Sequence, residues 1–265
     1  MIRKLPAILF LVAFLLVPGV ATAHVERPAV FPEAPGEVPA FRKGGPTLLV
    51  CKRKATLRKI QKLPNKAERR NERLYEECRE DGYRHIQAAV DHVTKQGSRI
   101  MILPGTYRER PSAGPPPAEC AGLEGQRPLS YEDQRRCPGV DNLISIFGDS
   151  EDHDFACDLP VCHLQIQGTG NSPDDVVVDN GFAKLNGIRA DRTDGIYFRN
   201  FMVQNSEFNA IYVIEADGFV IDRMIGRWND EYGFLTFADD HGFYTDCEAY
   251  GNGDSGIYPG APANI

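Results

Sequence analysis

The segment NGIRADRTDGIYFRNFMVQNSEF at residues 186–208 is followed by NAIYVIEADGFVIDRMIGRWNDE at 209–231 and by YGFLTFADDHGFYTDCEAYGNGD at 232–254. Apolar residues recur in these segments every 23 positions, each after a small residue: Ile188, Ile211, Phe234 and Ile257. Three more apolar columns align: Phe201 with Met224 and Cys247, Val203 with Gly226 and Ala249, and, with the third copy shifted by one residue in a turn, Ile196 with Phe219 and Phe243. We expect these columns to form the core.

A unit of this length, with short β-like runs and turns rich in Gly, Asn and Asp, cannot bury its apolar face alone. Stacked copies share a continuous interior. Strands of neighbouring copies would lie about 4.8 Å apart, so residues one repeat apart in sequence would lie above one another. The leucine-rich repeat is the alternative, but its Leu-x-x-Leu-x-Leu signature is missing. The repeat therefore predicts an all-β fold, a parallel β-helix.

Two segments upstream of the repeat extend the pattern. IQAAV at 86–90 precedes IMILPGTY at 100–107, and HLQIQG at 163–168 precedes PDDVVVD at 173–179. With the repeat, they resemble the secreted right-handed parallel β-helix proteins of the pectate-lyase-like superfamily, especially actinobacterial members of unassigned activity, over residues 83–265. The resemblance implies a right-handed coil with an α-helical cap at its start. It implies no single activity, because the superfamily contains lyases, hydrolases, epimerases, viral adhesins and inactive members.

The N-terminus predicts export. Arg3 and Lys4 precede an apolar run from Leu5 to Val17, and a small-residue triplet ends at Ala23, so residues 1–23 have the features of a secretory signal peptide. The run is shorter than the roughly 20 apolar residues of a membrane span; an uncleaved anchor is the alternative. We expect a secreted monomer with no membrane span after signal cleavage.

The rest of the chain divides by composition. Residues 24–46 are rich in proline, which favours an extended linker or wrapping arm. The β-helix is expected over 99–265, with a Cys- and Pro-rich insertion at 111–140 that contains a short helix capped by Ser130. The fourth copy stops without a closing cap, so we expect a C-terminally truncated chain. Residues 47–98 predict a basic, helical region with a strand at 47–50, a polar helix at 65–80 capped by Asn65, and an amphipathic capping helix at 85–96.

Charge is distributed unevenly along the chain. Residues 42–110 contain 18 Lys and Arg against 8 Asp and Glu, whereas residues 111–265 contain 9 against 26. The basic part could contact an anionic polymer of the cell envelope, or it could be a solvated helical surface that faces the acidic part. Nucleic acid is not expected as a partner of an exported chain.

Export permits disulfides. The repeat places Cys247 in the core, which leaves six cysteines and 15 possible pairings. Neighbour order favours Cys51 with Cys78, Cys120 with Cys137, and Cys157 with Cys162. A zinc site is the alternative, although the sequence has no C-x-x-C pair.

The turn RWNDEY at 227–232 is the main candidate site. It contains the only Trp of the chain, and Arg227 falls between Gln204 and Tyr250 with no acidic residue in its column. Trp228, Asn229 and Tyr232 could bind a sugar ring. Carboxylates one repeat apart could act as acid and base or nucleophile. The predicted catalytic residues are Arg227, Asp230, Glu231, Glu207 and His241. The alternative is a solvated corner.

A column of carboxylates is the candidate metal site. Asp194, Asp217 and Asp240 are 23 residues apart and would repel one another unless a cation bridges them. We expect calcium at Asp217 and Asp240; solvated turn carboxylates are the alternative. In other columns, Arg199 is expected to pair with Asp222 and Arg223 with Asp246.

Two functions remain from these patterns. The first is an exported β-helix protein that acts on polysaccharide as a lyase, epimerase or glycosidase. In the lyase or epimerase case, Arg227 or His241 would remove the proton next to a uronate carboxylate. The second is a non-catalytic β-helix that binds glycan or partner proteins at the cell envelope.

Overall fold

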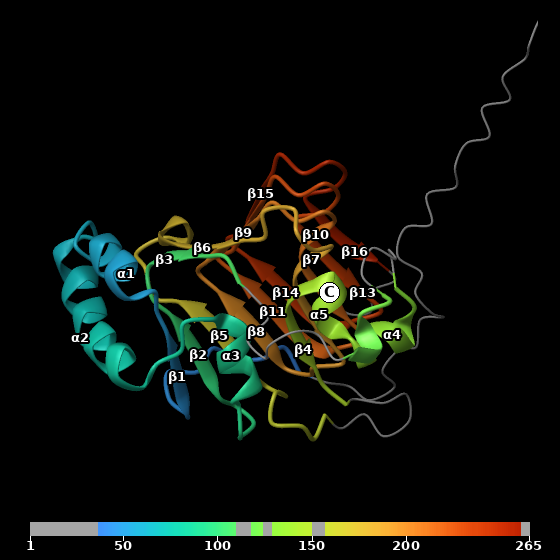
Figure 1. Cartoon of the computed structure of the whole chain (residues 1–265), viewed down its shortest axis with the longest axis horizontal. Helices are drawn as coiled ribbons and strands as arrows, with labels where there is room; N and C mark the ends of the chain where they lie inside the picture. The colour runs from blue at the N-terminus through green and yellow to red at the C-terminus, as the bar shows by residue number, and fades with distance from the viewer. Residues whose placement is uncertain (1–36, 110–117, 124–128, 150–156, 261–265) are drawn as a thin grey trace, which may run out of the picture.

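The computed structural model describes residues 37–109, 118–123, 129–149 and 157–260. This part of the chain is mostly β, with three parallel sheets and a few helices (Figure 1). The predicted signal peptide at 1–23 and the first part of the Pro-rich segment lie outside the described residues.

Each sheet is built from strands that are far apart in sequence and lie next to one another across the molecule. In order of adjacency, sheet A contains β1 (Thr47–Val50), β2 (Arg99–Ile102), β5 (Gln165–Gly168), β8 (Ile196–Arg199), β11 (Asp217–Asp222) and β14 (Asp240–Thr245). Sheet B contains β3 (Gly105–Tyr107), β6 (Val176–Asp179), β9 (Met202–Gln204), β12 (Ile225–Arg227) and β15 (Glu248–Tyr250). Sheet C contains β4 (Asn142–Phe147), β7 (Asn186–Asp191), β10 (Asn209–Ile214), β13 (Phe234–Phe237) and β16 (Ile257–Gly260).

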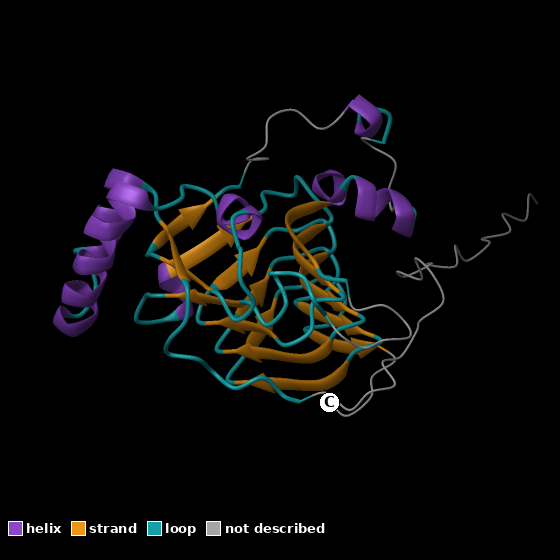
Figure 2. Ribbon diagram, turned by 90° about the horizontal axis from the view of Figure 1, so that it is seen from below, coloured by secondary structure: helices purple, strands orange, loops and turns teal. Residues whose placement is uncertain are grey.

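Every copy of the repeat contributes one strand to each sheet. The first copy forms β7, β8 and β9, the second forms β10, β11 and β12, and the third forms β13, β14 and β15. The chain therefore visits sheets C, A and B in turn and returns to sheet C one strand further along. This arrangement is compatible with the predicted parallel β-helix, and Figure 2 shows the strands stacked in layers with the helices at the periphery.

The register confirms most of the predicted columns. Ile188 pairs with Ile211, which pairs with Phe234, and Phe234 pairs with Ile257. The column that starts at Ile196 was assigned wrongly at its third position, because Phe219 pairs with Gly242 and Phe243 is 52% exposed. A Cβ at Gly242 would collide with the Phe219 ring, so the large side chain of one copy requires a glycine in the next.

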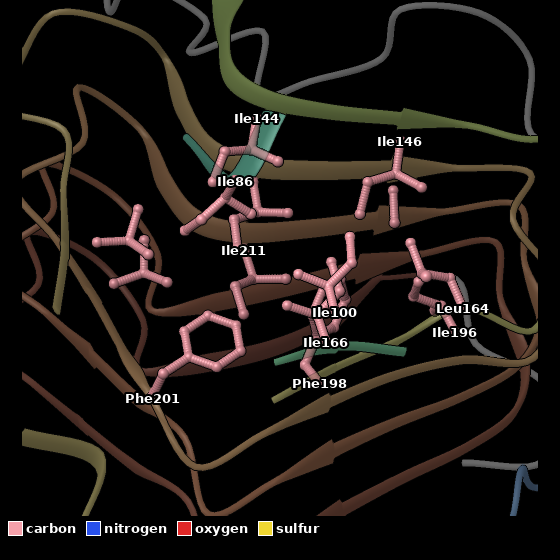
Figure 3. Packing of buried hydrophobic residues seen from close by; sticks show 14 of the residues in the cluster. Ile86, Ile100, Ile144, Ile146, Leu164, Ile166, Ile196, Phe198, Phe201 and Ile211 are labelled. Carbon is pink, nitrogen blue, oxygen red and sulfur yellow. The ribbon is translucent and has the colours of Figure 1, made fainter. Parts of the chain in front are cut away.

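The core lies between the three sheets. The first three residues of the Ile188 column are fully buried, as are Ile144 before them and Phe201 in a second column. Figure 3 shows Ile144, Ile211 and Phe201 pointing into the same interior. Each buried side chain of this size contributes about 1.5–3 kcal/mol relative to an exposed one, so the stacked columns are the main stabilising feature.

The N-terminal helices correct two predicted boundaries. Helix α2 (Asn65–Asp81) has Pro64 at its N-cap position, so Asn65 is the first helical residue and not the cap. Helix α3 (Ile86–Asp91) ends five residues earlier than predicted, and its apolar residues pack on the core; its role as a cap stays a prediction. A further helix, α1 (Arg53–Ile60), lies in the basic region, where the sequence pattern did not predict a helix at these residues. No helix in the described part of the chain is long and apolar enough to cross a membrane.

Three disulfides confirm the predicted pairing: Cys51–Cys78, Cys120–Cys137 and Cys157–Cys162. Cys247 is free, as expected. The described part of the insertion contains the short 3-10 helix η1 (Ala118–Cys120), α4 (Tyr131–Arg136) and α5 (Pro138–Asp141). Ser130 caps α4 as predicted and accepts a hydrogen bond from the Asp133 N–H at 3.2 Å. A second 3-10 helix, η2 (Pro173–Asp175), precedes β6.

Residues 37–46 cross the outer face of sheet A without forming a strand, and we call them the N-terminal strap. The Arg42 N–H donates to Gln165 Oε1 at 2.9 Å, and Gln165 Nε2 donates back to the Arg42 carbonyl at 3.1 Å. Near its start, the Glu37 carbonyl lies where a Cβ on Gly218 would be. This part of the Pro-rich segment therefore lies against the sheet in an irregular conformation.

Candidate functional site

Arg227 ends β12 between Gln204 and Tyr250, where the repeat placed it. Its guanidinium is occupied on several sides. Arg227 Nε donates to Gln204 Oε1 at 3.0 Å, and one terminal nitrogen donates to the Tyr250 hydroxyl at 2.9 Å. The guanidinium also lies 4.0 Å from the centre of the Trp228 ring and 3.9 Å from an Asp174 carboxylate oxygen. These contacts hold Arg227 as part of a packed corner, and the Asp174 carboxylate approaches it from outside the column of Gln204 and Tyr250.

The predicted sugar-binding residues divide by exposure. Trp228 is 47% exposed, but Arg227 stacks on the Trp228 ring. The ring also packs closely on Gly251, since a Cβ at that position would lie only 2.6 Å from Trp228 Cδ1. Asn229 is buried and joins neighbouring repeats: its Oδ1 accepts from the Ser206 N–H at 3.0 Å and its Nδ2 donates to Asn252 Oδ1 at 2.8 Å. In this conformation, its amide holds adjacent turns together.

Tyr232 is buried as well and packs on Tyr258 with ring centres 5.1 Å apart. Burial, followed by the charges of Asp254 and Glu231, raises the pKa of Tyr232 to about 12. Its phenol is therefore neutral at physiological pH.

The predicted acids lie around the same turn. Asp230 is exposed, while Glu207 and Glu231 are half-buried. Their backbones are fixed by neighbouring repeats, since the Asp230 N–H donates to the Ser206 carbonyl at 3.0 Å and the Glu207 N–H to the Lys184 carbonyl at 3.1 Å. These bonds place Glu207 and Asp230 on adjacent turns, as predicted, but their catalytic role stays a prediction.

A histidine lies beside two carboxylates of the Asp194, Asp217 and Asp240 column. His241 Nδ1 lies 3.2 Å from Asp217 Oδ1 and 3.2 Å from Asp240 Oδ1, and both aspartates are buried. His241 has φ +47° at a position where the two preceding copies have Gly195 and Gly218, also at positive φ. The residue thus adopts a backbone conformation that suits glycine, and this conformation brings its imidazole to the two carboxylates.

This donor set bears on the predicted calcium. Calcium takes about six to eight oxygen ligands, whereas an imidazole nitrogen beside two carboxylates is typical of divalent transition metals. Asp194 is engaged elsewhere, because its Oδ1 accepts from the Asp217 N–H at 2.9 Å. Calcium at Asp217 and Asp240 stays a prediction, and so does a role of His241 as a base.

A cavity of about 680 Å³ lies elsewhere, between α2, the strap and the outer face of sheet A. Phe41 on the strap and Met101 on β2 form apolar parts of its wall, and the polar groups include Gln167, Asn171 and Asn200. None of the described residues that line it is Asp or Glu. We call this cavity the basic groove because of seven cationic side chains in its lining: Lys43, Lys66, Arg70, Arg73, Arg99, Arg199 and Arg223.

Packing holds several of these cations in place. Arg199 forms the predicted ion pair with Asp222 at 3.1 Å, and its guanidinium lies 4.1 Å from the centre of the Phe41 ring. Arg70 donates to the Thr169 carbonyl, and burial lowers the pKa of Arg70. Arg223, which was expected to pair with Asp246, donates instead to the Asn171 carbonyl at 3.4 Å. Arg70, Arg199 and Arg223 are therefore held in fixed positions in the groove.

Sequence reasoning did not name these residues as a site. They come from the strap, from one face of α2, and from the ends of strands in sheet A. Their only signal in the sequence is the excess of Lys and Arg over residues 42–110, and part of the groove, Arg199 and Arg223, lies outside that range.

Fold and groove together define a mostly β protein with three parallel sheets, one of which carries a cationic groove on its outer face. No protein-family model, curated protein or solved structure matches the chain.

Proposed function

We propose that the chain is an exported right-handed parallel β-helix protein that binds an anionic polysaccharide in the basic groove. The three parallel sheets support the β-helix, and connections between parallel strands of one sheet are right-handed in about 98% of cases. The three disulfides support export, because such bonds persist in oxidising compartments.

The observation that carries the proposal is the charge of the groove. Seven cationic side chains line one cavity, and none of its described lining residues is acidic, in a chain whose net charge is -7. Like charges gathered in this way repel one another, and an anionic ligand would relieve that repulsion. Helix α2 adds to the effect because its N-terminal residues Pro64, Lys66 and Ala67 line the groove, and the N-terminus of a helix favours negative charge.

The other lining groups favour a sugar over a simple anion. Gln167, Asn171 and Asn200 provide amides that can exchange hydrogen bonds with hydroxyl groups. The Phe41 ring and Met101 provide apolar surface, which suits the face of a sugar ring. The cavity is also within the usual size of a ligand site, about 300–1,000 Å³. An acidic sugar polymer satisfies all three features.

Action on polysaccharide remains a prediction beside this proposal. Arg227 is engaged by Gln204, Tyr250 and Trp228, which leaves His241 as the candidate base. Incubation with pectate, alginate and neutral glycans, with and without calcium, would test catalysis through unsaturated products and new reducing ends.

Binding of polygalacturonate to the full chain tests the proposed function, with neutral dextran as the comparison polymer. We expect binding of polygalacturonate alone, with an affinity that falls as salt rises. The variant Arg73→Ala/Arg223→Ala should lose about tenfold or more in affinity. The control Arg58→Ala/Arg79→Ala removes the same charge from α1 and α2 outside the groove and should bind like the unmodified protein. Equal losses in both variants would show that the groove is not the site.

A further inference from the structure

The N-terminal strap is held against sheet A by few contacts. The reciprocal hydrogen bonds between Arg42 and Gln165 fasten its middle, and the Arg42 guanidinium donates to the His163 carbonyl. Phe41 packs edge-on against Tyr197 with ring centres 5.7 Å apart. Residues 37–46 form no regular secondary structure, and although the Pro46 carbonyl accepts from the Arg99 N–H at 2.8 Å, the strap lacks the ladder of backbone hydrogen bonds that fixes the strands beneath it. Segments held in this way open at low cost.

The strap is also part of the wall of the basic groove. Phe41 and Lys43 line the groove from the strap, and the Phe41 ring covers the Arg199 guanidinium of β8. Asp222 forms an ion pair with Arg199 at 3.1 Å and accepts a hydrogen bond from the Tyr197 hydroxyl at 2.8 Å. When the strap leaves the sheet, the groove loses one cation and one ring, and Arg199 loses the ring packed on it.

Charge opposes the docking of the strap. Arg42 on the strap lies within the influence of the Arg99 charge on β2, and Lys43 lines the same groove as Arg99. Burial lowers the pKa of Arg42, and the like charge of Arg99 adds a smaller effect in the same direction. An anion in the groove would contact cations on both sides and replace this repulsion with attraction.

We propose that the strap is an anion-dependent clasp: docking of residues 37–46 on sheet A and occupancy of the basic groove by an anionic polymer strengthen each other. The inference rests on the proposed function for its ligand, but the repulsion between strap and sheet exists without one. Because coupling between two equilibria is reciprocal, a ligand that prefers the docked strap must stabilise docking by the same factor by which docking improves its affinity.

Hydrogen exchange of strap peptides reports docking directly, since the Arg42 N–H is bonded to a side chain of the sheet. In the full chain without ligand, raising sodium chloride from about 20 mM to about 500 mM screens the like charges, so exchange in the strap should slow. At the low salt concentration, polygalacturonate should slow strap exchange by about threefold or more relative to the ligand-free protein. Neutral dextran should leave strap exchange unchanged. Exchange that is unchanged or faster with salt would overturn the clasp even if the protein binds no polysaccharide.

Gln165→Ala unfastens the strap; Gln165 does not itself line the groove, and the variant also removes the 3.1 Å hydrogen bond from Gln165 Nε2 to Gln167 Oε1 in the groove wall. We expect fast strap exchange at both salt concentrations and an affinity for polygalacturonate lower by about threefold or more. Gln134→Ala is the matched control, because it also removes a fully buried glutamine amide, one that donates to the Leu129 carbonyl at 3.1 Å in the insertion. If the unmodified protein binds polygalacturonate and Gln165→Ala binds it equally well, the clasp is wrong while the proposed function stands. If the unmodified protein does not bind polygalacturonate, the proposed function fails, and the salt dependence alone decides the clasp.

Discussion

Truncation of Ile211 to alanine tests the stacking that positions every site described above. Ile211 lies on β10 between Ile188 and Phe234 of the neighbouring repeats and is fully buried. Its replacement removes buried methyl groups and leaves a cavity that the fixed strand spacing cannot close. Substitutions of this kind cost about 2–5 kcal/mol, so we expect a loss of about 3 kcal/mol in the free energy of unfolding. For a chain of this size, that corresponds to a decrease in Tm of roughly 6–12 °C.

The same column supplies the control. Ile257 follows Phe234 one repeat later on β16, but its side chain is 41% exposed. Ile257→Ala makes the same chemical change and should cost less than about 1 kcal/mol. Guanidinium chloride unfolding followed by circular dichroism would measure both variants against the unmodified protein. Equal losses in the two variants would refute the inference that burial within the stacked columns stabilises the fold.

Three further predictions concern charge, cross-links and the corner at β12. Burial raises the pKa of Asp239 well above its usual range, so its stabilising contribution is complete below the ordinary carboxyl pKa and is lost as pH rises through the raised value. Asp239→Asn should therefore remove part of the loss of stability seen in unfolding measurements as pH rises from about 4 to 8. Cys51→Ala/Cys78→Ala removes the disulfide that closes a loop of 27 residues and links the end of β1 to α2. The variant should lose about 3.5 kcal/mol in the free energy of unfolding and bind polygalacturonate more weakly. Unchanged binding would show that the groove does not need this disulfide. Arg227→Met should leave polygalacturonate binding unchanged, because Arg227 does not line the basic groove, and a large loss would move the binding site to the corner.

The repeat was predictable because its signal is carried by apolar residues that have to face the core. A shift by one residue turns a strand's side chains to the opposite face, and the error at Phe243 shows the limit of that signal. Phe243 matched the apolar column better than Gly242, yet the Phe219 ring fills the space at that position and only glycine fits there. Residue types alone could not show that the Phe219 ring occupies the space that a side chain of the next repeat would need.

The groove was not predictable residue by residue for a different reason. Lys43, Arg73 and Arg199 belong to a strap, a helix and a strand whose positions relative to one another are set by tertiary packing. The excess of basic residues indicated an anionic partner but could not place its site. Conversely, the turn at Arg227 concentrated unusual residue types in a short segment, and the structure uses several of them to hold adjacent repeats together.

The regular spacing of the strands in sheet A fixes the distances between side chains on its outer face. Arg199 ends β8 and Arg223 directly follows β11, and these two adjacent strands lie about 4.8 Å apart in a sheet. Insertion of one more 23-residue unit between them would move the two guanidinium groups apart by one strand and leave the hydrogen-bonding pattern of all three sheets intact. In a fold of this kind, the number of inserted repeats therefore sets the spacing between cations on the outer face. That spacing can be fitted to anionic chains whose charges are closer together or further apart, while the interior stays the same.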